Sequence, residues 1–350
     1  MEHIREGVRS GRWSGRLPGV RPLSEELGVS RETLRSALRR LETEGFLAEG
    51  GPSGSRVIRD ANAVSKRRGS LRIALLPMQR MKSIDMRNQA LLLQLMHDLE
   101  AAGHSTTLIN LPVATQEPSV ASISRLVRER GADAWIVYMG SQEVIEWFAQ
   151  QPFPSLALGG RSAGVDIAAT GIDYAPALRK AVRDLVRLGH KRIVYICPRQ
   201  ARHPVPGRLV KGFLDELTAA GIPAGTYNVP DWEETPAGLR ALLESLFRFT
   251  PPTALILWNG IQVAGTLAFL SERKLSVPKD ISVISHRSDE SVAWQALGMG
   301  VDDFESDDSK IIRRVVRWAD NQAMGKDDKE QEIFEAEFTP SGTLGQAPKA

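Results

Sequence analysis

Residues 171–197, GIDYAPALRKAVRDLVRLGHKRIVYIC, contain the pattern that decides the fold of most of the chain. Residues 174–189 have the apolar spacing of an amphipathic helix, and Gly189 is placed to end that helix. Residues 191–197 follow at once as a short apolar run, which is typical of a buried strand. A helix followed directly by such a strand is the repeating unit of a parallel sheet covered by helices.

The same alternation continues in both directions from this stretch, beginning at Leu71. The expected strands are 71–77, 106–110, 133–139, 154–160, 191–197, 226–230, 253–259 and 281–286. Amphipathic helices are expected between most of them, among others at 87–103, 210–221 and 236–247. So many strands indicate two parallel sheets rather than one, with a crevice at the carboxyl ends of the strands.

Length and composition set the broad class of the protein. A chain of 350 residues has room for two or three domains, and 42% hydrophobic with 25% charged residues is close to the average soluble protein. The single cysteine, Cys197, allows no internal disulfide. Residues 1–13 show no apolar signal core, and no run approaches the ~18 apolar residues of a membrane span. We therefore expect a cytoplasmic protein with no membrane partner.

Charge is distributed unevenly along the chain. Residues 1–72 hold 15 Lys and Arg against 9 Asp and Glu, whereas the remainder holds 30 against 33. A small basic head on a mildly acidic body suggests an anionic partner for the head, although chance sampling gives such a difference too.

The head has the pattern of two helices around a tight turn. In residues 17–47, LPGVRPLSEELGVSRETLRSALRRLETEGFL, a short helix ends at Gly28, and Ser30 stands at the N-cap position of a longer helix. That helix has Leu34, Leu38 and Leu41 on one face and arginines on another. Short strands are expected at 46–49 and 55–60. The spacing alone fits a DNA-reading helix and an ordinary helical hairpin equally well.

Residues 4–58 resemble the winged helix-turn-helix of the GntR family of bacterial regulators, through IREGVRSGRW, the stretch 17–47 and GPSGSRV as the wing. The resemblance implies a small α+β domain that binds duplex operator DNA. Its implied DNA contacts are Arg21, Ser30, Arg31, Thr33 and Arg35, with Gly54 and Ser55 at the tip of the wing. Residues 1–60 are thus the expected DNA-binding domain and 61–70 the linker, whose Lys66, Arg67 and Arg68 either touch phosphate or are simply solvated.

Residues 71–340 resemble the ligand-binding domain of LacI-family repressors, which shares its fold with periplasmic sugar-binding proteins. The motifs LGHKRI, RLVKGF and VPKDISVI carry this resemblance. It implies a two-lobed α/β domain with crossings near residues 172, 300 and 328, a small-molecule effector between the lobes, and a homodimer. A GntR-type head on such a body is an arrangement similar to that of bacterial arabinose repressors, and it predicts a ligand-responsive regulator that acts as a repressor.

The resemblance also implies the effector contacts. Arg208, in RLVKGF, and Asn259, at the end of the strand 253–259, match positions that contact effector, and Trp258 either stacks on a sugar ring or fills the lobe interface. Asp173 is expected to shape a crossing rather than to touch ligand. Arg287 stands where the family usually has an acidic residue, and Gly260 replaces another. Because two guanidinium groups in one pocket repel each other unless an anion lies between them, we expect an anionic sugar derivative as effector.

Two other functions have to be weighed. An enzyme on an α/β scaffold is disfavoured because the chain lacks the GxGxxG and GxxxxGK[ST] motifs. The six histidines show no metal-ligand spacing, and His190 is expected to cap or pack rather than to catalyse. A sugar-binding module for transport is disfavoured by the DNA-binding head. No catalytic residue, metal or cofactor is expected.

Overall fold

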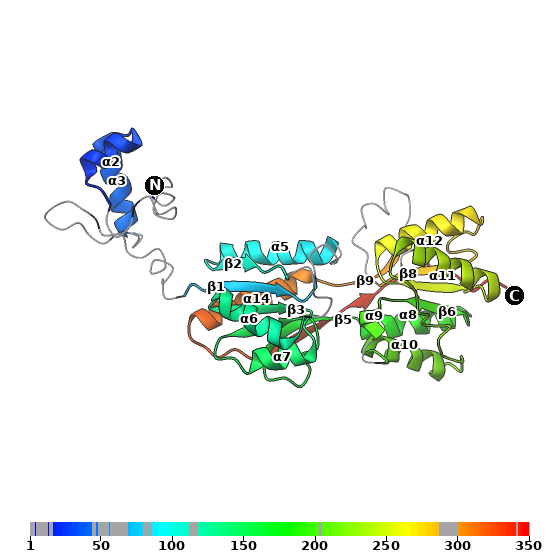
Figure 1. The fold of residues 1–350 in the computed structure, drawn as a ribbon. Helices are drawn as coiled ribbons and strands as arrows, with labels where there is room; N and C mark the ends of the chain where they lie inside the picture. The colour runs from blue at the N-terminus through cyan, green and yellow to red at the C-terminus, as the bar shows by residue number, and fades with distance from the viewer. Residues whose placement is uncertain are drawn as a thin grey trace.

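The computed structural model shows a helical head and a body of two α/β lobes (Figure 1). The residues that it describes are 4, 13, 17–43, 47, 56, 69–79, 84, 86–111, 118–202, 205–286, 300–340 and 342–349. No helix within these ranges is long and apolar enough to cross a membrane.

Two helices in the described part of the head pack on one apolar core. Helix α2 (Val20–Leu27) ends at Gly28, which adopts the left-handed conformation with φ of 63°, and α3 (Arg31–Thr43) follows. The predicted short helix, turn and longer helix are therefore present. The core residues of the head are Ile4, Trp13, Leu17, Leu23, Leu34, Leu38, Leu41 and Leu47. The expected wing strands at 46–49 and 55–60 lie almost entirely outside the described residues.

The first lobe is built on a six-stranded sheet with the order β10-β5-β4-β3-β1-β2, in which every neighbouring pair is parallel. Its strands are β1 (Arg72–Pro77), β2 (Ser105–Leu108), β3 (Ala134–Tyr138), β4 (Ser155–Leu158), β5 (Ala168–Asp173) and β10 (Gln331–Glu335). The second lobe is built on a five-stranded sheet with the order β11-β9-β8-β7-β6. Its strands are β6 (Ile193–Ile196), β7 (Ala254–Leu257), β8 (Ser282–Ser285), β9 (Asp302–Glu305) and β11 (Glu337–Phe338), and only the β9–β11 pair is antiparallel.

Helices cover both faces of each sheet, so strands β3, β4, β6, β7 and β8 are buried on both sides. In the first lobe, Ile73 and Leu75 face α5 (Met86–Ala101) and α14 (Asp308–Ala323), whereas Ala74 and Leu76 face the opposite layer. That opposite layer holds α6 (Val120–Arg130) and α7 (Gln142–Ala149). The described helices of the second lobe are α8 (Ala175–Arg187), α9 (Arg199–Arg202), α10 (Arg208–Ala219), α11 (Pro236–Phe249) and α12 (Gly260–Glu272). The predicted two-lobed α/β architecture is confirmed.

The described chain passes between the lobes at three places. The first crossing joins β5 to α8 at 173–175, the second joins β9 to α14 at 305–308, and the third joins β10 to β11 at Ala336. The third crossing lies later than the expected position near 328, because β10 pairs with β5 in the first sheet through Glu335. All three crossings leave from the carboxyl ends of strands, so those ends of both sheets meet at one interlobe junction.

The segment 226–230, expected as a strand, forms a turn instead. The buried side chain of Asn228 explains the difference, since its Oδ1 accepts a hydrogen bond from Gly225 N at 3.0 Å. Its Nδ2 donates to Ile193 O at 2.9 Å, and its backbone O accepts from Tyr195 N at 2.7 Å. Asn228 thus hydrogen-bonds the backbone groups of Ile193 and Tyr195 at the edge of β6, where a whole paired strand was expected.

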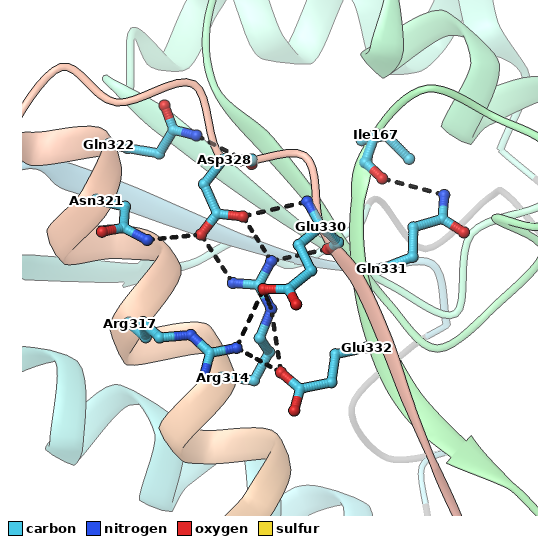
Figure 2. Close-up of polar contacts among 9 residues, drawn as sticks. All are labelled: Ile167, Arg314, Arg317, Asn321, Gln322, Asp328, Glu330, Gln331 and Glu332. Carbon is cyan, nitrogen blue, oxygen red and sulfur yellow. Dashed lines mark hydrogen bonds and ion pairs between the residues drawn. The ribbon is translucent and has the colours of Figure 1, made fainter.

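A buried polar network fixes the chain just before the third crossing (Figure 2). Arg314, from α14, donates to both carboxylate oxygens of Asp328 at 3.1 and 2.7 Å and to Glu330 O at 2.7 Å. Asn321 donates to the same Asp328 carboxylate at 2.9 Å. Gln331 adds hydrogen bonds to the backbone oxygens of Ser162, Val165 and Ile167. The network joins α14, the start of β10 and the loop before β5.

The chain beyond residue 340, the expected end of the body, also packs on the second lobe. Gly345 O accepts a hydrogen bond from His190 Nε2 at 3.0 Å, and Gly345 N donates to Ser282 Oγ at 3.0 Å. Ala347 N donates to Leu188 O at 2.9 Å. His190 is 1% exposed, and its role in the structure is to hold the C-terminal segment.

Candidate functional site

The N-terminus of α3 is organised by two of the predicted DNA contacts. Ser30 Oγ accepts a hydrogen bond from Thr33 N at 3.1 Å, which is the N-cap bond that its position predicted. The Ser30 and Thr33 hydroxyl groups also share a hydrogen bond of 2.8 Å. Both residues are exposed. Polar hydroxyls and the free N–H groups of this helix end are suited to a phosphate oxygen.

Exposed arginines surround this helix end. Arg31 and Arg35 are exposed one turn apart on α3, while Leu34 and Leu38 are buried in the core of the head. Arg21, on α2, forms an exposed ion pair with Glu25 at 3.5 Å. The structure thus gives α3 one apolar face and one face that carries guanidinium groups. Gly54 and Ser55, at the predicted wing tip, lie outside the described residues.

Arg208 lies at the interlobe junction, at the first residue of α10. The preceding Gly207 fixes this position, because a Cβ there would lie 1.9 Å from Ala201 O. The Arg208 guanidinium donates to the carboxylate of Asp173, the last residue of β5 in the other lobe. The other Asp173 oxygen, Oδ1, accepts from Ala175 N at 3.0 Å. Asp173 therefore shapes the first crossing, as expected, and also pairs with the predicted effector residue.

This ion pair changes the argument about charge in the effector site. From the sequence, an anionic ligand was expected between Arg208 and Arg287, because two guanidinium groups in one pocket repel each other. The structure supplies that anion from within the chain as Asp173. Arg287, the second guanidinium of that argument, lies outside the described residues.

Asn259 and Trp258 lie at the carboxyl end of β7 in the second lobe. Asn259 is the N-cap of α12, and its Oδ1 accepts from Gln262 N at 3.0 Å. Gln262 Oε1 in turn accepts from Trp258 N at 2.8 Å. The Trp258 ring stacks on His286, with centroids 4.4 Å apart and planes 9° apart. Trp258 is partly buried, so both readings of its role, ring stacking with a ligand and filling of the interface, stay open.

His286 is the centre of an aromatic cluster that sequence reasoning did not predict. It is 1% exposed, and its ring lies 4.7 Å from Tyr174 and 5.1 Å from Phe304. Tyr195 Oη and His286 Nδ1 share a hydrogen bond of 3.2 Å. Burial raises the pKa of Tyr195 well above its ordinary value, and the nearby Cys197 raises it further, so the phenol stays protonated. The cluster packs at the second-lobe side of the junction.

A pair of glutamines also joins the two lobes at the junction. Gln79, after β1, donates from Nε2 to Oε1 of Gln200 on α9 at 2.6 Å. Within the first lobe, Arg87 Nε, on α5, donates to Asp308 Oδ2 of α14 at 3.0 Å beside the second crossing. No sequence pattern predicts the glutamine pair, because single glutamines far apart in the chain form no motif.

Other features of the described residues do not build a competing site. No group of three potential metal-binding side chains occurs among them. A hollow of about 580 Å³ lies between α5 and α14, lined by residues such as Asp98, Ile312, Arg317 and Met324. It contains none of the predicted effector residues, and Arg208, Asn259 and Trp258 lie at the interlobe junction instead.

Two different family models match the head and the body. Residues 1–57 match the model of the bacterial regulatory proteins of the gntR family. Residues 182–340 match the model of the periplasmic binding protein-like domain.

Two curated relatives illustrate the similarity in sequence. Catabolite control protein A of Priestia megaterium is 26% identical over 153 residues, which is 43% of this chain and 46% of that protein. The transcriptional regulator AglR of Rhizobium meliloti is 27% identical over 261 residues, which is 71% of each chain. The chain thus spans less than half the length of the first of these relatives.

Solved structures support the fold of the body. A regulatory protein of the LacI family from Chloroflexus aggregans has a TM-score of 0.65 and 19% identity, and covers 78% of this chain and 98% of its own. The lac repressor dimer bound to operator and an anti-inducer has a TM-score of 0.66 and 17% identity, and covers 82% and 99%. At this level of identity the likeness concerns the fold alone.

Proposed function

We propose that this chain, which joins a GntR-type helix-turn-helix head to a LacI-like, periplasmic-binding-protein-like body, is a ligand-responsive transcriptional regulator that acts as a repressor. One observation carries the proposal: a helix with exposed arginines and a two-lobed domain with three crossings occur in one chain. Catabolite control protein A and AglR, to which the chain is similar, are named as regulators. The protein would act in the cytoplasm, on duplex operator DNA.

The DNA-binding step uses the exposed face of α3. Helix α3 enters the major groove, where Arg31 and Arg35 reach base edges. Ser30 and Thr33 bind a phosphate at the helix N-terminus, and Arg21 binds the adjacent backbone. Gly54 and Ser55 complete the contact at the wing. The burial of Leu34 and Leu38 supports this orientation, because it leaves the arginine face toward solvent.

The effector binds at the interlobe junction. Arg208 binds paired hydroxyls or a carboxylate with its forked donors, Asn259 adds amide contacts, and Trp258 packs against the ring of the ligand. Arg287 adds a second cation, which makes an anionic sugar derivative the preferred effector. Effector binding favours one arrangement of the lobes and thereby changes the spacing or freedom of the heads on DNA.

The proposed regulator acts as a homodimer. Two heads related by a two-fold axis match a palindromic operator with half-sites one or more helical turns apart. The similar lac repressor is described as a dimer bound to its operator, which supports this arrangement.

A gel-shift titration of the full chain with the DNA upstream of its own gene tests the proposal. We expect a shifted complex that withstands excess unrelated DNA and is released by one compound from a panel of sugars, sugar acids and sugar phosphates. Equal binding to unrelated DNA would contradict sequence-specific regulation. A specific complex that no compound of the panel affects would contradict the proposed effector class while leaving the DNA-binding function in place.

A further inference from the structure

The Arg208–Asp173 ion pair connects the two lobes at the first crossing. Arg208 begins α10 in the second lobe, and Asp173 ends β5 in the sheet of the first lobe. The two side chains differ in exposure: 72% of Arg208 is exposed, but only 17% of Asp173. The guanidinium can therefore be reached from solvent while its carboxylate partner is mostly buried.

Asp173 is also the point at which two crossings meet. Its backbone O accepts a hydrogen bond from Ala336 N at 3.0 Å, which ties it to the third crossing. Its carboxylate Oδ1 accepts from Ala175 N at 3.0 Å, which ties it to the first. Loss of the cation that pairs with this carboxylate therefore affects two of the segments about which the lobes can move.

We propose that Asp173 is an internal competitor for Arg208 and thereby determines which effectors the site accepts. The inference rests on the proposed function, since it takes Arg208 as an effector contact. An anionic ligand that binds the guanidinium must displace the Asp173 carboxylate and then lies close to that second negative charge. Neutral hydroxyls can accept hydrogen bonds from the remaining guanidinium donors without that displacement. Asp173 therefore lowers the preference of the site for anionic effectors.

The same exchange couples effector binding to the hinge. Once Arg208 turns to the effector, Asp173 is a mostly buried carboxylate that keeps the Ala175 N–H but loses its cation, which is an unfavourable state. A movement of the crossings that exposes the Asp173 carboxylate to water removes this unfavourable state. Because the Arg208 side is solvent-exposed, the ion pair is weak enough to be exchanged rather than permanent. The Gln79–Gln200 hydrogen bond, an uncharged contact between the lobes, is expected to respond much less to this exchange or to salt.

A distance measurement without ligand tests the contact. Spin labels on Ala121→Cys in α6 and Ser245→Cys in α11, both exposed, place one probe on each lobe. The buried Cys197 is not expected to label. We expect Asp173→Asn and Arg208→Gln to broaden or shift the distance distribution alike, and the double variant to add nothing further.

The matched control is Glu272→Gln, which removes an arginine–carboxylate pair with Arg240 that lies within the second lobe. It should leave the distribution unchanged. If Asp173→Asn and Arg208→Gln behave like Glu272→Gln, the contact between lobes has no influence and the proposal is overturned. Arg208→Gln keeps the test valid if Asp173→Asn disturbs folding.

Calorimetry with glucuronate, glucose 6-phosphate and glucose tests the selectivity. In the wild type we expect either anion to bind more tightly than glucose, and Asp173→Asn to increase that preference about fivefold, because Arg208 then has no competing carboxylate in a partly exposed ion pair. An unchanged or reduced preference would overturn the selectivity role of Asp173. If none of the three binds to either protein, the proposed effector class fails together with the selectivity role, while specific DNA binding in the gel shift would still support a DNA-binding regulator.

Discussion

Arg314 forms a bidentate ion pair with Asp328 (Figure 2). The arginine side chain has no exposed surface, and the aspartate side chain is 7% exposed. Charges buried to this degree are tolerated when both partners are present and well supplied with hydrogen bonds. Here Glu330 O and Asn321 Nδ2 supply the additional hydrogen bonds. The pair fixes the turn between α14 and β10, and so the chain that leads to the third crossing.

The first prediction follows from removing one half of this pair. Arg314→Gln leaves the Asp328 carboxylate buried without its cation and should lower the free energy of unfolding by roughly 3–5 kcal/mol. Chemical denaturation followed by circular dichroism measures the change. Arg240→Gln, which removes a solvent-exposed pair with Glu272, is the matched control and should have little effect. Equal stability of Arg314→Gln and wild type would show that the network is not structural.

The second prediction concerns the acid side of the stability profile. Burial alone would raise the pKa of Asp328, but hydrogen bonds from Asn321, Arg314 and Glu330 N outweigh it and lower the pKa below the ordinary value. A carboxyl with a lowered folded-state pKa stabilises the fold above its unfolded pKa of about 3.9, and that contribution is lost as the pH falls through the folded value. Asp328→Asn should thus have a lower free energy of unfolding than wild type at pH 7. The difference between the two free energies should become smaller below about pH 4, as denaturant titrations at several pH values would measure.

The third prediction concerns the C-terminal segment. Burial lowers the pKa of His190, and the hydrogen bond to Gly345 O opposes the shift only in part. The folded state therefore prefers the neutral ring, so its contribution to stability is complete above the unfolded pKa of about 6.5 and declines as the pH falls below it.

Hydrogen exchange at Gly345 and Ala347 measures this effect, after correction for the intrinsic pH dependence of exchange. Protection should be high at pH 7.5 and reduced at pH 5.5. His97→Gln, on the exposed side of α5, is the control and should leave protection at both pH values as in wild type. Protection that does not change with pH would remove His190 from this role.

The sequence predicted the architecture well where one physical rule acts alone. Apolar runs between amphipathic helices identified most strands of the two sheets, and Gly28 and Ser30 marked the turn and cap of the head. It failed at 226–230, where the side chain of Asn228 satisfies the edge of β6 and no periodic pattern is involved. Strand β10 was missed because its exposed and half-buried residues lack the continuous apolar run of the central strands.

The candidate site was less predictable because pairing partners are far apart in the chain. The position of Arg208 at the junction follows from its motif, but nothing in the sequence shows that its guanidinium meets Asp173. Likewise, His286 is in the sequence a single polar residue after a strand. Its ring contacts with Trp258 and Tyr174 form only in the folded chain. Contacts between lobes depend on the relative position of two domains, which local patterns do not encode.

The fourth prediction uses the single thiol. Burial, the largest cause, raises the pKa of Cys197 to about 12, and its side chain is 1% exposed. The reactive thiolate is therefore scarce and inaccessible in the native protein. A chromogenic disulfide reagent at pH 8 should react with less than one thiol per chain over an hour in buffer and with one thiol in denaturant. Rapid reaction of the native chain would contradict the packing around β6.

The last prediction tests how α3 reads DNA. Arg31 and Arg35 share the exposed face of the helix, so replacing either with Ala should weaken operator binding by about 1–3 kcal/mol if it contacts a base edge. Loss of a base contact reduces the preference for operator over unrelated DNA, whereas loss of a phosphate contact weakens both alike and reduces the slope of log affinity against log salt by about one. Fluorescence anisotropy at several salt concentrations separates these outcomes for each arginine. Arg128→Ala, which removes an exposed arginine from α6 in the body, controls for net charge and should change neither the affinity nor the slope. A folded Arg31→Ala/Arg35→Ala variant that binds the operator with wild-type affinity would exclude this face of α3 as the reading surface.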